Sequence, residues 1–142
     1  MVDTTTIHWG IAATGGIAAQ MTRALRTLPD AEVAAVGSRT QESADAFAGE
    51  HGIPRAHGSY ADLYADDGID VVYVASPHSG HRAMTIDALR AGRHVLCEKA
   101  FAVNTAQAEE MIATARSEGR FLMEAMWSWF MPAWVEMRRR ID

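Results

Sequence analysis

The sequence predicts an α/β fold built on a doubly wound parallel sheet. Apolar segments of strand length alternate with helical patterns from one end of the chain to the other, which is typical of repeated strand–helix–strand units. The segment IDVVYVAS (69–76) is almost wholly apolar, as expected for a strand buried on both faces of a parallel sheet. The chain has 142 residues, of which 49% are hydrophobic and 22% charged, which suits one globular domain with a single core.

The strands are expected where apolar, β-branched runs are bounded by turn residues. These runs predict strands at 6–13, 31–38, 53–56, 69–76, 94–98 and 120–127. The helices between them should pack as right-handed crossovers on the two faces of the sheet.

The helices are expected from apolar residues spaced three and four apart and from their end signals. They are predicted at 16–28, 41–52, a short segment after Ser59, 80–92, 105–119 and onward from Pro132. In the first of these, Ile17, Met21, Leu25 and Leu28 are expected to share the buried face. Ser59 with Asp62 predicts a capping box, Asn104 with Gln107 predicts a second, and Gly52 suits a C-terminal cap.

Composition excludes several classes of function. The formal charge of −5 argues against a nucleic-acid partner, because neutralising phosphates needs a basic excess. The single cysteine, Cys97, cannot form an internal disulfide and is expected to be a small buried apolar residue. The N-terminus lacks a leader pattern and no segment has the length of a membrane span, so we expect a cytoplasmic protein without membrane contact. The histidines and the cysteine show no metal-ligand spacing, so no metal is expected.

A glycine-rich turn follows the first predicted strand. It fills the frame of the G-x-G-x-x-G/A dinucleotide-binding fingerprint with Ala13, Thr14, Gly15, Gly16, Ile17 and Ala18. Gly15 would let the backbone approach a pyrophosphate, and the first amides of the next helix would face the anion. Ala13 departs from the first glycine and needs a turn that tolerates a β-carbon. The alternative is an ordinary strand-to-helix connection.

The end of the second strand should meet the adenosine ribose. NAD-preferring sites usually place a carboxylate there, but this strand ends in Gly37, Ser38, Arg39 and Thr40. A guanidinium beside hydroxyls suits a 2′-phosphate. We therefore predict NADP rather than NAD, with an ordinary surface arginine as the alternative.

The sequence resembles the N-terminal half of the Gfo/Idh/MocA oxidoreductases. The resemblance spans nearly the whole chain and rests on WGIAATGGIA, on SR after the second strand, and on VVYVASPHSGHRAMTIDALRAGRHVLCEKA. The segment EAMWSWFMP is similar to the branch of dihydrodiol dehydrogenases and glucose–fructose oxidoreductases. Two positions differ from the family pattern, because Ala100 replaces the proline of Glu-Lys-Pro and Trp129 replaces a common arginine.

The resemblance implies a nicotinamide-dependent dehydrogenase with a Rossmann-type domain. Lys99 would lie beside the nicotinamide as the catalytic residue and stabilise a developing alkoxide. Glu98 would support it by holding nearby backbone or cofactor groups. The alternative is a solvent-facing Glu-Lys pair. The other residues implied on the cofactor side follow the fourth strand, namely Ser76, Pro77, His78 and His81. His78 would line the cleft, with a plain turn histidine as the alternative, and His81 is favoured as structural.

The predicted domain organisation is a dinucleotide-binding domain at 1–126 followed by the truncated start, at 127–142, of a connection to a missing C-terminal substrate domain. In the family that second domain supplies the acid–base residue. The aromatic residues Trp127, Trp129, Phe130 and Trp134 would pack against it or line the substrate cleft.

The predicted function is hydride transfer between NADP and a carbinol carbon of a sugar, cyclitol or dihydrodiol, with this chain alone inactive. The alternatives are a non-catalytic dinucleotide-binding module and an interaction protein that uses the aromatic surface. Homo-oligomerisation is compatible with the sequence.

Overall fold

The computed structural model describes residues 6–141 and contains one six-stranded sheet in which all strands are parallel. The order across the sheet is β3-β2-β1-β4-β5-β6. The strands are β1 (Ile7–Ala12), β2 (Ala31–Gly37), β3 (Arg55–His57), β4 (Val71–Val74), β5 (His94–Cys97) and β6 (Leu122–Glu124). Residues 1–5, on which the prediction of no leader partly depends, and Asp142 lie outside the described residues.

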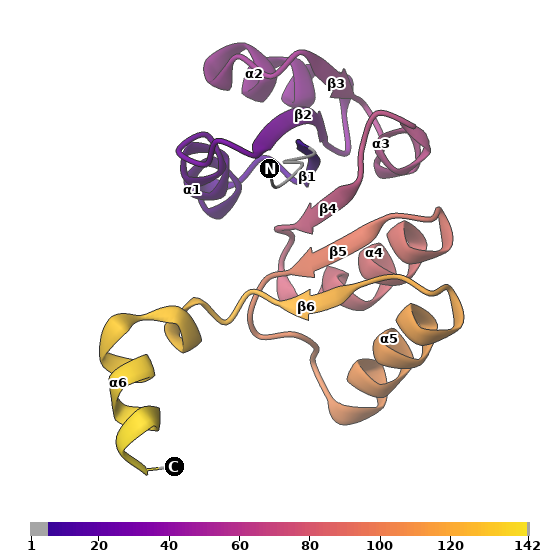
Figure 1. Ribbon diagram of the computed structural model, residues 1–142. Helices are drawn as coiled ribbons and strands as arrows, with labels where there is room; N and C mark the ends of the chain where they lie inside the picture. Colours follow the sequence, from indigo (N-terminus) through magenta and orange to yellow (C-terminus); the bar gives the residue numbers. More distant parts are fainter. Residues whose placement is uncertain (1–5, 142) are drawn as a thin grey trace.

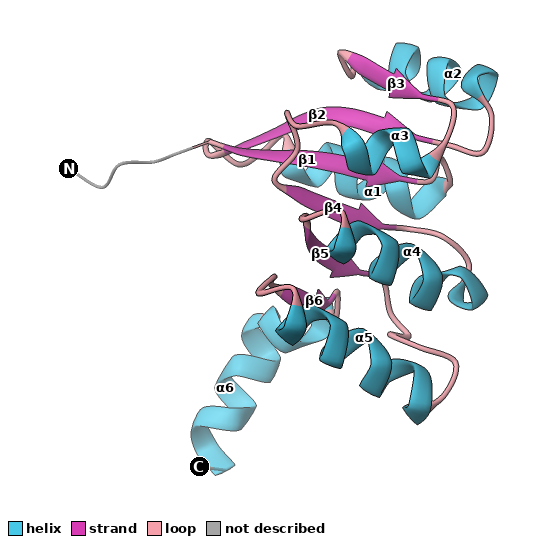
Figure 2. Ribbon diagram, turned by 90° about the vertical axis from the view of Figure 1, so that its right-hand side faces the viewer, coloured by secondary structure: helices cyan, strands magenta, loops and turns pink. Residues whose placement is uncertain are grey.

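Helices cover both faces of the sheet (Figures 1 and 2). They are α1 (Gly16–Leu25), α2 (Gln41–His51), α3 (Tyr60–Ala65), α4 (His78–Arg90), α5 (Thr105–Ser117), the 3₁₀ turn η1 (Trp127–Phe130) and α6 (Pro132–Ile141). One face carries α1 and α2, and the other carries α3, α4 and α5. The predicted doubly wound parallel sheet is thereby confirmed. None of the helices in the described part combines the length and apolar character needed to cross a bilayer.

The predicted helix ends are largely confirmed. Gly52 closes α2 in the left-handed conformation with φ of 58°, where glycine carries no steric cost. The side chains of Ser59 and Asn104 accept from the backbone N–H groups of Asp62 and Gln107. The reciprocal half of the two predicted capping boxes is not formed, because Asp62 accepts from the Ser59 hydroxyl and Gln107 Oε1 has no partner among the described residues. These caps satisfy amides that a helix cannot satisfy itself.

The buried face of α1 differs from the prediction. Its buried residues are Ala18, Thr22 and Leu25, whereas Ile17 is 41% exposed. Leu28 lies beyond the helix in the following turn and is also exposed. The small Ala18 lets α1 lie close to the sheet, and the Thr22 hydroxyl is satisfied by donating to the Ala18 carbonyl oxygen at 2.9 Å.

Some element bounds also differ from the prediction. β4 ends at Val74, and α4 begins at His78, two residues earlier than expected, because Pro77 serves as its N-terminal cap residue. β6 ends at Glu124, and the following aromatic residues form η1 instead of extending the strand. These shifts shorten both strands, while α4 begins early enough that its connection to β4 keeps the predicted length.

The core consists of two clusters of apolar side chains, one on each face of the sheet. Fully buried members include Ile11, Leu63, Val72 and Leu89. Each such side chain contributes about 1.5–3 kcal/mol through removal from water. This packing fixes the strand ends, where the connections to α1 and α4 leave the sheet on opposite faces.

Candidate functional site

The strand order reverses between β1 and β4, since β1 leads to β2 on one side and β4 leads to β5 on the other. In open α/β sheets, ligands bind outside the carboxyl ends of the strands at such a switch point. The predicted residues Gly15, Arg39, His78 and Lys99 follow β1, β2, β4 and β5. Because these strands are parallel, the four positions lie along one edge of the sheet.

The glycine-rich turn leaves open space at the start of α1. Gly15 is the N-terminal cap residue, with φ of −85° and ψ of 178°, a conformation open to any residue. A β-carbon at Gly15 or Gly16 would meet no heavy atom within 4 Å among the described residues. Neither conformation nor packing therefore requires glycine at position 15. The first turn of α1 contains no acidic residue, and no side chain of residues 6–141 caps its amides.

Ala13 occupies the first position of the turn with φ of 115°. L-residues rarely adopt this conformation, because the β-carbon approaches the backbone too closely. Its N–H donates to the Gly37 carbonyl oxygen at 3.0 Å, which ties the turn to the end of β2. Thr14, beside it, is half-buried. The backbone at Ala13 therefore adopts the conformation for which the fingerprint has a glycine, and this conformation is strained for an alanine.

We expect Ala13→Gly to stabilise the protein. Release of the strained φ outweighs the added chain entropy of glycine and leaves a net gain of about 1 kcal/mol, which corresponds to about 3 °C in Tm. Thermal unfolding followed by circular dichroism measures the shift. The matched control is Ala12→Gly, in β1, where the methyl group is fully buried and its loss should lower Tm. A lower Tm for both variants would contradict strain at Ala13.

The end of β2 carries one exposed cation. Arg39 is exposed, whereas Ser38 is 6% exposed and its N–H donates to the His57 carbonyl oxygen. The Thr40 hydroxyl caps α2 by accepting from the Ser43 N–H, and it donates to the Ser43 hydroxyl. Of the two hydroxyls predicted beside the guanidinium, that of Thr40 is therefore taken up by the helix cap, and Arg39 is the exposed cation at this tip.

Lys99 lies in an exposed position two residues after the end of β5 and is the only lysine of the chain. The peptide bond between Lys99 and Ala100 is cis. The Lys99 N–H donates to Glu98 Oε2 at 3.0 Å, and the Lys99 carbonyl oxygen lies 3.1 Å from His78 Nε2. Both peptide groups that flank the Lys99 Cα are therefore held by side chains.

The two histidines at the start of α4 have different surroundings. His78 is exposed, whereas His81 is fully buried, with Nε2 2.9 Å from the Ser76 carbonyl oxygen and Nδ1 2.9 Å from that of Ala100. His81 thus joins the turn after β4 to the loop after β5. This position favours the structural role for His81 over contact with a cofactor. Pro77 is exposed, and Ser76, half-buried, donates its hydroxyl to the Pro77 carbonyl oxygen.

Glu98 is satisfied inside the protein. It is 9% exposed, and its Oε1 accepts from the Tyr73 hydroxyl at 2.5 Å while Oε2 accepts from the Lys99 N–H. Glu98 is expected to hold either nearby backbone groups or the cofactor, and the structure shows it bonded to the backbone N–H of Lys99. Tyr73 is the residue that sequence reasoning missed, since a tyrosine within an apolar strand carries no signal other than that of a core residue.

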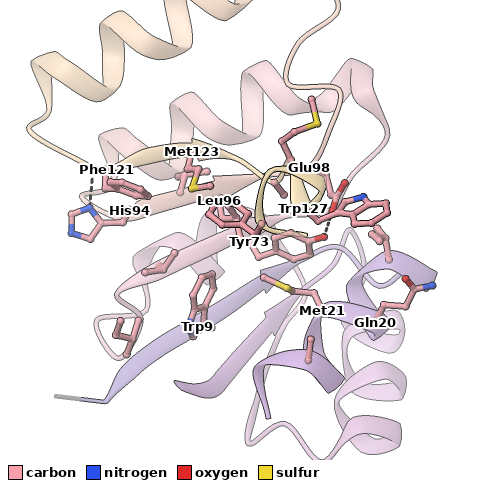
Figure 3. A pocket seen from close by; sticks show the side chains of 18 residues that line it. Trp9, Gln20, Met21, Tyr73, His94, Leu96, Glu98, Phe121, Met123 and Trp127 are labelled. Carbon is pink, nitrogen blue, oxygen red and sulfur yellow. Dashed lines mark hydrogen bonds between the residues drawn. The ribbon is translucent and has the colours of Figure 1, made fainter. Parts of the chain in front are cut away.

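A separate apolar groove of about 680 Å³ lies on the face of the sheet beside α1 (Figure 3). Trp9, Tyr73, Leu96 and Met123 lie along it. Trp127 and Phe130 of η1 also line the groove, and all four predicted aromatic residues are exposed, namely Trp127, Trp129, Phe130 and Trp134. The groove runs along the strands and reaches their carboxyl ends, where Ile17 and Glu98 also line it.

Two further predictions concern reactive side chains. Cys97 is fully buried, and burial raises the pKa of its thiol to about 12, so the expectation of a buried apolar residue is confirmed. Within residues 6–141, no group of three or more His, Cys, Asp or Glu side chains is placed to hold a metal ion.

The chain is similar to known dehydrogenases in sequence. It is 47% identical over 132 residues to trans-1,2-dihydrobenzene-1,2-diol dehydrogenase of Xenopus tropicalis, with 92% of this chain and 40% of that protein covered. It is 44% identical over 134 residues to the Homo sapiens enzyme of the same name, with 93% and 40% covered. The chain therefore spans 40% of the length of these curated relatives.

Solved structures show the same fold. An NAD-binding oxidoreductase from Klebsiella pneumoniae superposes with a TM-score of 0.91 at 31% identity, covering 96% of this chain and 39% of that one. The 3-ketoreductase KijD10 from Actinomadura kijaniata, in complex with NADP and TDP-benzene, superposes with a TM-score of 0.89 at 34% identity, covering 97% and 42%.

The family model described as "Oxidoreductase family, NAD-binding Rossmann fold" matches residues 7–126. This range contains the sheet with all six strands, the glycine-rich turn and Lys99. The chain belongs to the Gfo/Idh/MocA oxidoreductase family and contains its NAD(P)-binding Rossmann fold.

Proposed function

We propose that this chain binds NADP along the carboxyl edge of its sheet and forms the nucleotide-binding part of a dehydrogenase. The observation that carries the proposal is the open space at Gly15, a glycine that neither conformation nor packing of the protein requires. A diphosphate would occupy the space that a β-carbon would otherwise fill. The free amides and the dipole of α1 would favour its negative charge.

The preference for NADP depends on Arg39. The guanidinium is exposed at the tip of β2, where a carboxylate would select NAD by accepting from the ribose hydroxyl. Here a bidentate, charge-assisted contact with a 2′-phosphate is available. The solved 3-ketoreductase relative that holds NADP supports this choice.

The proposed reaction moves hydride between the carbinol carbon of a small polyol and the cofactor. When bound, the nicotinamide ring accepts or gives the hydride at its C4. The ammonium of Lys99 would hydrogen-bond the substrate oxygen and stabilise the negative charge that develops there as the hydroxyl proton passes to the acid–base residue expected in the second domain. The held peptide groups on either side of Lys99 keep that ammonium near one place.

The proposed substrates are sugars, cyclitols and dihydrodiols. The relatives named for a dihydrodiol support this class, as does the ketoreductase crystallised with TDP-benzene. The domain division proposed from the sequence, with a connecting segment from residue 127, assigns the rest of the substrate pocket to a second domain. A module that binds dinucleotide without turnover is the remaining candidate, and oxidation of candidate alcohols with NADP by the full-length protein distinguishes the two.

We expect Arg39→Asp to weaken NADPH binding about 100-fold, a loss of about 2.7 kcal/mol, and to change NADH binding by less than about threefold. The aspartate removes the bidentate contact and repels the 2′-phosphate. Nucleotide fluorescence titration measures both affinities. The matched control is Arg116→Asp, an exposed arginine on α5, which changes the net charge equally. Equal losses for NADPH and NADH would reject the phosphate contact.

A further inference from the structure

Tyr73 and Glu98 lie on the same side of the sheet although they come from different strands. β4 and β5 are paired so that Tyr73 is opposite Leu96, and Glu98 follows Leu96 by two residues. Side chains two residues apart along an extended chain point to the same face. Figure 3 shows both side chains on the groove side, joined by a hydrogen bond.

The bond between them is short and shielded. The Tyr73 hydroxyl donates to Glu98 Oε1 at 2.5 Å, with Tyr73 only 1% exposed and Glu98 9% exposed. Burial, and next the bond to Glu98, raise the pKa of Tyr73, so the hydroxyl keeps its proton and remains a donor. The second carboxylate oxygen accepts from the Lys99 N–H at 3.0 Å.

Such a placement is costly for a side chain with no more than a packing role. Most side chains that line the groove are apolar, among them Met123 and Trp127, and a buried carboxylate there needs donors for both oxygens. The two donors are Tyr73 and the backbone of Lys99. If one donor is removed, the carboxylate must rotate to bond water or shift its position relative to the remaining donor.

Holding the sheet together does not need this pair. The regular pairing of β4 with β5 runs from Val71 to Val74, and the Glu98 N–H extends it by donating to the Val74 carbonyl oxygen at 3.0 Å. Glu98 makes two side-chain bonds, one from the Tyr73 hydroxyl on the neighbouring strand and one from the N–H of Lys99, the next residue. The second bond acts on the Lys99 loop, and the first holds the carboxylate that makes it.

We propose that Tyr73 and Glu98 are a positioning pair that fixes the backbone of Lys99, and thereby the direction of its ammonium, for the reaction at the strand ends. The inference rests on the proposed function for its consequence in turnover. Glu98 holds the N–H of Lys99 on one side, and His78 holds its carbonyl oxygen on the other. Tyr73 keeps the Glu98 carboxylate in the orientation in which its second oxygen accepts from the Lys99 N–H.

The test compares Tyr73→Phe with Tyr64→Phe. Tyr64 is also buried, at 4% exposed, but its hydroxyl has no hydrogen-bond partner within residues 6–141, so its loss should be harmless. The first readout is hydrogen exchange of the Lys99 amide by NMR. The second is the ¹³C signal of the Lys99 side chain after reductive methylation of this chain, in which Lys99 is the only lysine and the N-terminal amine the only other methylated group. The third is kcat of the full-length protein.

In Tyr73→Phe we expect Lys99 amide exchange at least about tenfold faster and a shifted methyl signal. Turnover should be about tenfold lower at unchanged cofactor KM. Tyr64→Phe should match the wild type. Unchanged amide protection in Tyr73→Phe overturns the proposal, as does faster exchange with wild-type kcat. If Tyr73→Phe does not fold, Glu98→Gln is judged by the same criteria, since its one acceptor oxygen cannot serve both donors as the carboxylate does. The exchange measurement needs no cofactor, so failure to bind NADPH would count against the proposed function alone.

Discussion

Lys99→Ala is expected to lower turnover of the full-length protein by about 10³-fold, the loss that follows removal of one donor to a developing oxyanion. On the proposed function the ammonium stabilises charge that exists chiefly in the transition state, so cofactor affinity should stay within about threefold of wild type. Steady-state kinetics with NADP and a dihydrodiol or polyol measure the first quantity. NADPH fluorescence titration measures the second.

The composition of the chain adds a second measurement for the same prediction. Because Lys99 is the only lysine, an amine-directed reagent can modify one side chain besides the N-terminus. We expect such a reagent to label Lys99 in this chain, as read by mass spectrometry, NADPH to protect Lys99 from the label, and Lys99→Arg to carry no label at position 99. The arginine keeps the charge in a different shape, so it separates a need for positive charge from a need for the ammonium. Loss of NADPH affinity by orders of magnitude in Lys99→Ala would contradict the assigned role.

The fold could be predicted from the sequence because its signals are local. Alternation of apolar strands with helices, the glycine at position 52 and the caps at Ser59 and Asn104 each follow from neighbouring residues. The buried face of α1 could not be predicted in the same way. Ile17 and Leu28 fit the helical spacing of apolar residues, but the surface under α1 accommodates Ala18 and Thr22 instead. That choice depends on the shape of the sheet, which local spacing does not encode.

The candidate site likewise has parts that could be predicted from neighbouring residues and parts that could not. The turn at Gly15 and the tip at Arg39 could be predicted because each follows a strand, and parallel strands place their carboxyl ends together. The contacts beneath Lys99 could not, because they join residues distant in sequence. Tyr73 and Glu98 are 25 residues apart, and His81 is 19 residues from Ala100. Pairing of β4 with β5 is what brings them together, and a tyrosine in an apolar strand gives no sign of a polar partner.

Gly15→Ala is expected to weaken NADPH binding about 30-fold, equivalent to about 2 kcal/mol, without lowering stability. The added β-carbon would project into space where the protein has no atom within 4 Å, and on the proposed function that space belongs to the diphosphate. The backbone conformation of Gly15 suits alanine, so Tm should remain equal or rise slightly. Titration and thermal unfolding on the same samples separate the two effects.

Gly49→Ala is the matched control for this variant. Gly49 lies inside α2, and a β-carbon there would likewise meet nothing within 4 Å among the described residues. It should raise stability by about 0.5–1 kcal/mol, because alanine is the better helix former, and leave NADPH affinity unchanged. Both glycines have open space around an added β-carbon. They differ in position, because Gly15 lies at the start of α1, after β1, and Gly49 lies inside α2. Wild-type NADPH affinity in Gly15→Ala would mean that the amides of α1 do not approach a diphosphate, and the proposed cofactor site would then be wrong.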